Sequence, residues 1–282
     1  MGIKNYRELS DLDKQDIVDY YKFKNKNFNE ISKMLEVSER SVSRVLKEDG
    51  IKTRRKNRYT LNEYYFHNIN SQEKAYILGF IYADGYVGND NFNNIVISVN
   101  DKEILDKICN EFEFTGEIRR TTKGGFENLK QGFSLNFSSE IMARRLREIG
   151  LYPNKSLTIT QLPKIKNELM RHFVRGYFDG DGTVILSSHT SYHKVGGITK
   201  KYEYPSFSFG ILGTEKFLRQ IAKYMQIKHY KIRDTKTLEI KNLTCSAKTE
   251  SRFIYDYLYK DSTIYLERKY NKWNYILSAF TK

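Results

Sequence analysis

Two apolar stretches of this chain have nearly the same pattern and end in the same way. The first covers residues 77–85 and the second residues 173–182, and in both an aspartate and a glycine follow the last apolar positions. Each stretch has small residues four positions apart, which an α-helix places on one face. The pattern predicts two helices whose backbones approach each other closely through these small faces.

The stability of each helix alone does not explain the small faces. A glycine inside a helix costs about 1 kcal/mol relative to alanine, and an aspartate at the C-terminal end costs ~0.3–1 kcal/mol through the helix dipole. Packing explains the small residues, because they let a second backbone come close. The residues predicted to pack are Gly79, Ala83, Gly176 and Gly180.

Packing of the two helices would place Asp84 and Asp181 side by side at one end. Two adjacent carboxylates repel each other unless a proton or a cation is shared between them, and carboxylate oxygens suit Mg²⁺. Either stretch alone would be explained as a buried helix capped by Gly85 or Gly182. The recurrence of the whole pattern 97 residues later indicates duplicated half-domains instead.

After each apolar helix the pattern changes from helical to alternating, which is typical of strands. Strands are predicted at residues 94–99, 116–122 and 133–137 in the first half, and at residues 206–211, 229–234 and 237–245 in the second. Helices are predicted at residues 101–112 and 214–225. Each half is therefore predicted as helix, two strands, helix, two strands and helix, which is an α+β fold. The half-domains are residues 71–152 and 167–282, and residues 153–166 connect them.

The N-terminal residues, 1–52, predict a separate all-α module. Apolar positions indicate a helix near residues 12–23 and a short helix and turn at residues 29–38, and Ser38 can cap a third helix that ends at Gly50. This spacing resembles the helix-turn-helix of phage and resolvase-type DNA-binding proteins, whose third helix enters the major groove. A plain three-helix packing module is the alternative. The resemblance implies DNA contacts by Arg40, Ser41, Arg44 and Lys47.

Residues 53–70 are predicted to be a basic linker, because apolar periodicity stops there. The basic residues are Arg54, Arg55, Lys56 and Arg58. Such a run is either a solvated segment or an arm that lies along phosphates or in the minor groove and releases counterions.

Composition favours a polyanionic partner. The chain has 282 residues, and 48 lysines and arginines against 34 aspartates and glutamates give a formal charge of +14. No apolar run approaches the ~20 residues that span a bilayer, and the first residues lack signal-peptide features. Cys109 and Cys245 stand far apart, which excludes a disulfide framework and a cysteine-based zinc site. We expect a cytoplasmic protein of a bacterium or phage, with an organelle as the alternative, and no membrane partner.

The duplicated segments resemble the LAGLIDADG homing endonucleases over residues 71–275. Residues 78–85 (Leu-Gly-Phe-Ile-Tyr-Ala-Asp-Gly) and 174–182 (Val-Arg-Gly-Tyr-Phe-Asp-Gly-Asp-Gly) stand at the motif positions. The resemblance implies an αββαββα unit in each half, sheets that lie in adjacent major grooves, and Asp84 and Asp181 as metal-binding catalytic acids. The carbonyls of Ala83 and Gly180 are implied to face the metals. Tyr82 stands where the motif has its first acid, which is not the catalytic one.

The position of the DNA-reading strands is predicted more sharply than their individual contacts. A basic residue on an exposed strand either contacts DNA or protects the sheet edge. The candidates are Arg119, Arg120, Lys123, Arg233 and Lys236. A polar insertion, residues 187–204, is predicted to form a long hairpin along DNA. Its histidines, His189 and His193, have no acid or cysteine at ligand spacing, which argues against zinc.

With these features, the resemblance implies a monomeric, sequence-specific homing endonuclease that makes a staggered double-strand break in a long, pseudo-symmetric DNA target. The resemblance implies hydrolysis with Mg²⁺ as cofactor, Ca²⁺ as a non-catalytic substitute, and basic residues near the scissile phosphates, for which Lys155 and Lys248 are the candidates. The alternative is a non-catalytic DNA-binding regulator or an RNA maturase with the same fold. The presence of both acids argues for the nuclease.

Overall fold

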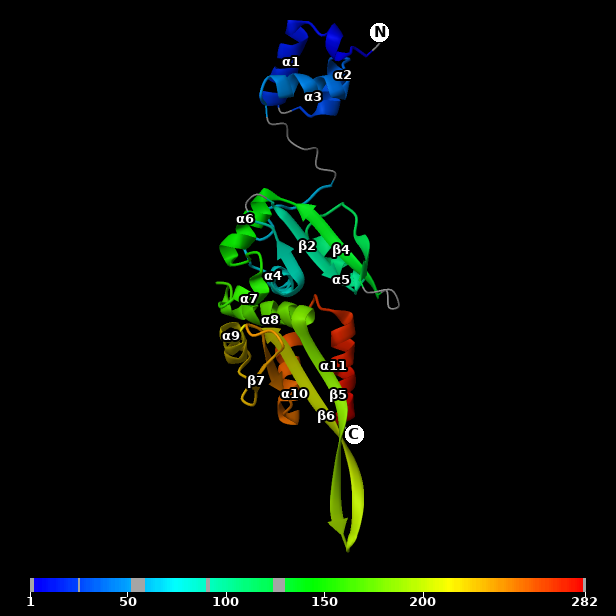
Figure 1. The fold of residues 1–282 in the computed structure, drawn as a ribbon, viewed down its shortest axis with the longest axis vertical. Coiled ribbons are helices and arrows are strands. Elements are labelled where there is room, and N and C mark those ends of the chain that lie inside the picture. The colour runs from blue at the N-terminus through cyan, green and yellow to red at the C-terminus, as the bar shows by residue number, and fades with distance from the viewer. Residues whose placement is uncertain (1–2, 25, 52–58, 90–91, 124–129, 281–282) are drawn as a thin grey trace. The chain divides into compact units, whose positions relative to one another are not determined.

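The computed structural model describes residues 3–24, 26–51, 59–89, 92–123 and 130–280. Contacts divide the chain into two compact units, residues 1–58 and residues 59–282 (Figure 1). Each unit has its own hydrophobic core, so the two are described separately. Across the described ranges, no helix is long and apolar enough to cross a membrane.

The N-terminal unit contains a short 3₁₀ helix (Tyr6–Glu8) and the helices α1 (Asp11–Lys22), α2 (Phe28–Met34) and α3 (Glu39–Glu48). Each α-helix begins at a capping side chain, because Ser10, Asn27 and Ser38 accept a hydrogen bond from a backbone N–H in the first turn. In the turn between α2 and α3, Glu36 has a φ of 51°, a conformation that glycine adopts more readily. The small core of this unit includes Ile17, Ile31, Val42 and Leu46.

The larger unit consists of two halves with the same order of elements. The first half comprises α4 (Gln72–Asp84), β1 (Gly85–Val87), β2 (Asn94–Val99), α5 (Lys102–Glu111), β3 (Arg119–Lys123), β4 (Lys130–Ser138) and α6 (Glu140–Ile149). The second comprises α8 (Asn167–Asp181), β5 (Gly182–Val195), β6 (Ile198–Gly213), α9 (Glu215–Met225), β7 (Lys231–Asp234), β8 (Lys241–Cys245) and α10 (Lys248–Tyr259). A one-turn helix, α7 (Lys155–Thr158), lies in the connector, and α11 (Glu267–Phe280) follows α10.

Each half contains one four-stranded antiparallel sheet with equivalent strand order. The first sheet has the order β1-β2-β4-β3 and the second the order β5-β6-β8-β7. The predicted α+β fold and the predicted sequence of elements in each half are confirmed. Strand β1 begins directly after α4, and β5 begins directly after α8, so each motif helix passes into a strand at its terminal glycine.

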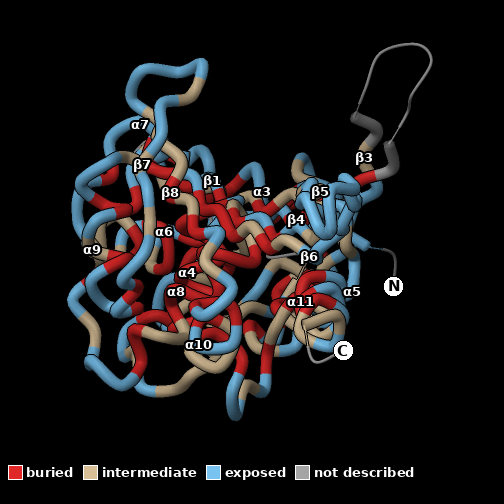
Figure 2. The backbone as a smooth tube through the Cα atoms, turned by 90° about the horizontal axis from the view of Figure 1, so that it is seen from below, coloured by how far each residue is buried: buried red, intermediate tan, exposed pale blue. Residues whose placement is uncertain are grey.

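One face of each sheet is apolar and buried against helices, whereas the other face is open. Successive side chains of a strand point to opposite faces. In β2, Ile95 and Ile97 are fully buried while Val96 and Ser98 are partly exposed. In β6 the buried side chains are Phe207, Phe209 and Ile211. Figure 2 shows that α4 and α8 run through the buried centre of the unit.

The predicted linker of residues 53–70 is wrong in its second part. Tyr65 is 3% exposed and Phe66 is fully buried, because both aromatic rings pack in the core of the larger unit. The backbone N–H of Thr60 also donates to the hydroxyl of Thr115. Residues 59–70 therefore belong to the duplicated unit.

Candidate active site

The motif helices α4 and α8 touch backbone to backbone. A Cβ atom added to Gly79 would lie 2.0 Å from the carbonyl oxygen of Phe173. A Cβ atom added to Gly176 would lie 1.9 Å from the carbonyl oxygen of Tyr76. No side chain fits at either position without moving one helix. These two glycines therefore set the distance between the helices.

The same packing brings the ends of both helices together. A Cβ atom added to Gly180 would lie 2.3 Å from the Cβ of Ala83 and 3.2 Å from Oδ2 of Asp84. Asp84 ends α4 and Asp181 ends α8, and each is followed by a glycine that begins a strand. Burial raises the pKa of Asp181, and the ammonium groups of two nearby lysines act in the opposite direction. Asp84 is exposed.

Those two lysines hold equivalent positions at the ends of the motif helices. Lys155 is 7% exposed, and its Nζ donates a hydrogen bond of 3.0 Å to the carbonyl oxygen of Ala83. Lys269 is 6% exposed, and its Nζ donates to the carbonyl oxygens of Phe178 and Gly180 at 2.7 and 3.2 Å. Each lysine therefore binds the carbonyl group that precedes a terminal aspartate.

The ends of the two helices explain why buried ammonium groups occur there. The last carbonyl groups of a helix have no intrahelical partner, and the negative end of the helix dipole attracts a cation. Burial is the main cause that lowers the pKa of both lysines, to about 8 for Lys269. Asp84 and Asp181 counteract burial and raise the pKa of each lysine.

The residue at the position of the first motif acid differs between the two halves, and so do its contacts. Tyr82 donates its hydroxyl to the carbonyl oxygen of Ile149 at 2.8 Å. The equivalent residue, Asp179, is buried and accepts hydrogen bonds from the hydroxyls of Tyr76 and Tyr259 and from the backbone N–H of Leu266. Burial raises the pKa of Asp179, and these donors counteract it. Tyr82 thus contacts the end of α6, whereas Asp179 contacts the end of α10 and the segment that follows it.

A polar cavity of about 240 Å³ opens beside Asp84. It is lined in part by Asp84, Asp101, Asn100, Gly180 and Arg268. The guanidinium of Arg268 pairs with Asp101 at 3.2 Å and thereby ties α11 of the second half to the start of α5 in the first. The cavity therefore lies where the halves meet.

The donor atoms at this place suit a hard cation. They are carboxylate and carbonyl oxygens, which Mg²⁺ and Ca²⁺ prefer. Among the described residues, no group of three or more histidines, cysteines, aspartates or glutamates could hold a metal ion. Oxygens of this kind are present on Asp84 and Asp181 and on the carbonyls of the residues before them, Ala83 and Gly180.

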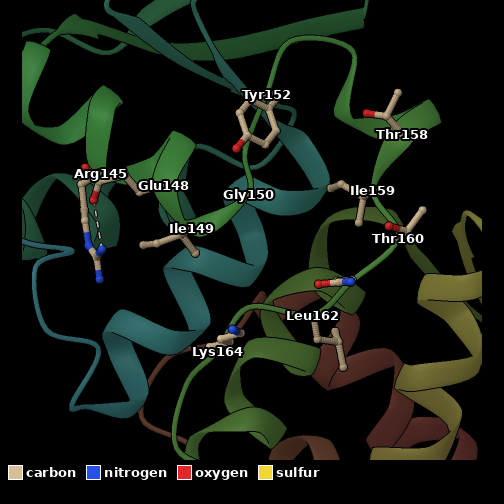
Figure 3. A pocket seen from close by; sticks show the side chains of 11 residues that line it. Arg145, Glu148, Ile149, Gly150, Tyr152, Thr158, Ile159, Thr160, Leu162 and Lys164 are labelled. Carbon is tan, nitrogen blue, oxygen red and sulfur yellow. Dashed lines mark hydrogen bonds and ion pairs between the residues drawn. The ribbon is translucent and has the colours of Figure 1, made fainter.

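A larger cavity, of about 540 Å³, lies away from the acids against the connector (Figure 3). Its lining includes Arg145, Tyr152, Ile159 and Lys164. Neither motif aspartate lines it, so its size does not make it the site. We assign the candidate site by the chemistry of the paired acids.

Lys248 lies elsewhere. Its Nζ lies 4.8 Å from the ring centroid of Phe280, near the end of α11. Phe280 is about 16 Å along that helix from Lys269, at 1.5 Å per residue. Lys248 is therefore not beside the acids, and the lysine that sequence analysis failed to select is Lys269. The equivalent placement of Lys155 and Lys269 after the last helix of each half was the available signal.

Only some of the predicted DNA-contact residues lie on the open faces of the sheets. Arg119 pairs in register with Ser134 and Arg233 with Asn242, both on the open face. Arg120 pairs with Phe133, so it lies on the opposite face of the sheet from Arg119, although its side chain is exposed on this edge strand. Lys236 lies in the loop between β7 and β8. Lys123 ends β3, and its side chain lies outside the described residues.

The open faces also carry polar residues that sequence analysis did not select. Tyr86 lies opposite Val96, and Lys231 opposite Thr244, at positions that alternate with core residues. Asn136 occupies an equivalent position on β4. Strand alternation combined with the register would have identified these side chains.

In the N-terminal unit, Arg40, Arg44 and Lys47 are exposed on one side of α3. Arg44 lies over the ring of Tyr6 at 4.0 Å and pairs with Glu48. The prediction that Ser41 faces DNA is wrong, because Ser41 is 2% exposed and its hydroxyl faces that of Ser38. The exposed serine of this helix is Ser43. Arg54, Arg55, Lys56 and Arg58 lie outside the described residues.

No protein-family model matches the sequence, and no curated protein matches it. The I-LtrWI LAGLIDADG homing endonuclease, solved bound to its target DNA, is similar with a TM-score of 0.51 and 14% identity, over 78% of this chain and 92% of that chain. The LAGLIDADG meganuclease I-AabMI, solved bound to uncleaved DNA, has a TM-score of 0.46 and 10% identity, over 74% and 90% of the two chains. The likeness to I-LtrWI, together with the duplicated halves, shows that this chain has the fold of the LAGLIDADG homing endonucleases, with both half-domains in one polypeptide.

Proposed function

We propose that this protein is a sequence-specific, divalent-metal-dependent DNA endonuclease that acts as a monomer and makes a staggered double-strand break in a long, pseudo-symmetric target. One observation carries the proposal. The acids Asp84 and Asp181 end two helices that touch through glycines, and each has a buried lysine beside it. A structural helix pair needs neither a carboxylate at its negative pole nor a buried ammonium beside it.

The duplicated arrangement suits two strands cut by one chain. Each half supplies one acid, one lysine and one open sheet face, so each half can act on one strand of a duplex. A two-stranded ribbon fits the major groove of DNA, and the open faces carry polar and basic side chains such as Arg119 and Arg233. The formal charge of +14 favours association with the phosphates.

In this proposal Asp84 and Asp181 bind divalent cations, Mg²⁺ in the reaction and Ca²⁺ as the inactive substitute. A bound cation lowers the pKa of a water molecule and stabilises charge that develops on the scissile phosphate. Lys155 and Lys269 orient the carbonyls of Ala83 and Gly180 and keep a positive charge beside the phosphates. The buried Asp179 is a structural group, because its oxygens already accept three hydrogen bonds.

The N-terminal unit is proposed to add a second DNA-binding surface. Its exposed basic side chains on α3 are Arg40, Arg44 and Lys47, and Ser43 lies among them. The basic run from Arg54 to Arg58 continues toward the duplicated unit in sequence. Two binding units on one chain raise affinity through effective concentration.

Because the target sequence is unknown, the experiment begins with selection. The full chain is used to select duplexes from a randomised library in Ca²⁺, and the selected duplex is then incubated with Mg²⁺. We expect cleavage of both strands by the wild type, and binding without cleavage by Asp84→Asn and Asp181→Asn. Binding without cleavage by the wild type would instead indicate a regulator, and selection of RNA rather than DNA would indicate a maturase.

A further inference from the structure

The hairpin formed by β5 and β6 extends well beyond its sheet (Figure 1). The third strand, β8, pairs with β6 only from Phe209 to Gly213. The β5–β6 ladder continues outward past the buried Phe207 and ends at the pair Val195 and Ile198. The part from Ser187 to Val195 reaches about 26 Å at ~3.3 Å per residue. Among the strands in the described part of the chain, none pairs with this outer ribbon, residues 187–206.

In the described residues of the first half, the equivalent strands pair only over a short stretch. These strands are β1 (Gly85–Val87) and β2 (Asn94–Val99), and they pair over three positions. A two-stranded ribbon alone is at best marginally stable in water. The outer ribbon is therefore a one-sided addition whose form suits a bound partner.

The two faces of the outer ribbon differ in chemistry. Residues that pair directly across an antiparallel ladder share a face, so the register assigns every side chain. One face continues the open face of the sheet, which Thr183 and Ile185 occupy further in. We call it the aromatic face; it carries His189, Ser191, His193, Val195, Ile198, Lys200, Tyr202 and Tyr204.

The side chains of the aromatic face are arranged in a row. The rings of Tyr202 and Tyr204 lie 6.3 Å apart and nearly parallel, at 17°. The ring of His193 meets that of Tyr202 edge-on at 5.5 Å, and its Nε2 lies 2.8 Å from the hydroxyl oxygen of Ser191. Tyr204 is 47% exposed. The row thus presents hydroxyl and imidazole groups to solvent.

Negative charge is confined to the opposite face. Among residues 187–206 the acid is Glu203, which lies on that face and pairs with Lys201 at 2.5 Å. The opposite face also carries Tyr192 and Lys194. The aromatic face combines Lys200 with hydrogen-bond donors and has no carboxylate, which makes it complementary to a polyanion.

We propose that the aromatic face of the outer ribbon binds duplex DNA beyond the segment covered by the sheets, on the side of the second half only. This inference rests on the proposed function. It extends the DNA target by a flanking segment next to the second half. The aromatic face continues the sheet surface that the proposal places on DNA, and a ribbon of this width enters a major groove. Its reach of about 26 Å is roughly three quarters of a helical turn of ~34 Å.

The chain offers a matched control for this surface. The variant Lys200→Ala/Tyr202→Ala removes one ammonium and one phenol from the aromatic face. The variant Tyr192→Ala/Lys194→Ala removes the same groups from the opposite face. Both pairs are exposed and change the net charge equally, so a difference between them reports the face and not the charge.

The test uses the full chain and the duplex selected in Ca²⁺, with long flanks on both sides. We expect the aromatic-face variant to bind at least tenfold more weakly, to lose protection against hydroxyl radicals at one end only, and to lower the salt slope by ~0.9 for the lost phosphate contact. The opposite-face variant should match the wild type. On a duplex shortened at that end, all three proteins should bind equally.

Equal weakening by the two variants, or unchanged binding by both, would overturn the inference. A wild-type dimer that the aromatic-face variant converts to monomers, without loss of the footprint, would assign the ribbon to protein contact and overturn it as well. The outcome is separate from the proposed function. Cleavage in Mg²⁺ tests the nuclease, whereas the one-sided footprint tests the ribbon.

Discussion

The ammonium group of Lys269 lies 3.2 Å from the carbonyl oxygen of Gly180, the residue before Asp181. Lys155 makes the equivalent contact with Ala83, the residue before Asp84. The two halves therefore share a unit of lysine, carbonyl and aspartate that neither motif contains by itself. In each half, this unit places a lysine at the end of the motif helix that carries the proposed catalytic aspartate.

We predict that Lys155→Met or Lys269→Met lowers the rate of cleavage at least tenfold. A buried hydrogen bond to a charged group contributes about 1.5–3 kcal/mol, and its loss frees the carbonyl that lies beside the proposed metal-binding acid. Single-turnover cleavage of the selected duplex measures the rate. The control is Lys248→Met, which removes a lysine that lies over Phe280 and should cleave normally. Equal rates for all four proteins would contradict the prediction.

The lowered pKa of Lys269, about 8, predicts a pH dependence of stability. Below pH 8 the lysine is protonated in both the folded and unfolded chains. Between pH 8 and the ordinary value of 10.5 the unfolded chain holds more protons, so the free energy of unfolding rises with pH by up to ~1.4 kcal/mol per unit. The burial penalty of the charge is thus present below pH 8 and relieved above it.

Urea unfolding in EDTA at pH 7.5, 8.5 and 9.5 measures this effect, with the fluorescence of Trp273 as the signal. Trp273 is the single tryptophan and is buried against Phe178 of α8, so it reports the duplicated unit. The free energy of unfolding of the wild type should rise relative to that of Lys269→Met as pH rises, because the variant lacks the titrating group. Parallel curves for the two proteins would disprove this role of burial.

We predict that Gly176→Ala destabilises the duplicated unit by about 1–3 kcal/mol, because the added methyl group overpacks the helix interface. Its Cβ would lie 1.9 Å from the carbonyl oxygen of Tyr76. The control is Gly196→Asn in the hairpin turn, where nothing lies within 4 Å and asparagine tolerates the φ of +61°. An unchanged urea midpoint for Gly176→Ala would refute close backbone packing.

Asp179 and Asp181 are predicted to respond oppositely to the same substitution. Asp179→Asn should lower the melting temperature, since it disturbs a buried carboxylate that accepts from Tyr76, Tyr259 and Leu266, while the folded fraction still cleaves in Mg²⁺. Asp181→Asn should leave the fold intact and abolish cleavage. Thermal melts and cleavage at 20 °C or another permissive temperature separate the two. Loss of cleavage by fully folded Asp179→Asn would place this acid in the chemistry.

Removal of residues 1–58 is predicted to weaken DNA binding by orders of magnitude while cleavage persists at high protein concentration. The duplicated unit has its own core and should keep its melting temperature. Each lost phosphate contact lowers the slope of log K against log salt by ~0.9. A truncated chain with the affinity and slope of the full chain would show that the N-terminal unit does not bind this DNA.

The repeat made most of the fold predictable, because two copies of one pattern define each other's limits. The predicted strand at residues 94–99 coincides with β2. The segment before α4 was misassigned, because Tyr65 and Phe66 are adjacent and give no period, although both are buried. Local pattern does not reveal that long-range packing.

The site was predictable where it lies on regular elements. The positions of Asp84 and Asp181 were predictable because both residues end a helix. Strand alternation places Arg119 and Arg120 on opposite faces once the register is known. The buried role of Lys269 was missed, because a lysine after a loop looks solvated until a helix end is found beside it, and only its match to the position of Lys155 gave a signal. Ser41 was misassigned because a short polar residue on a helix fits either a core or a surface.

The glycine contact between α4 and α8 has a consequence for how such proteins diversify. At Gly79 and Gly176 the halves meet through main-chain atoms, which are the same in every sequence. Matching of large side chains across this part of the interface is therefore not required. Two half-domains with different recognition strands could be recombined in one chain if both glycines are retained, and each half could then acquire a new DNA preference without disturbing its neighbour.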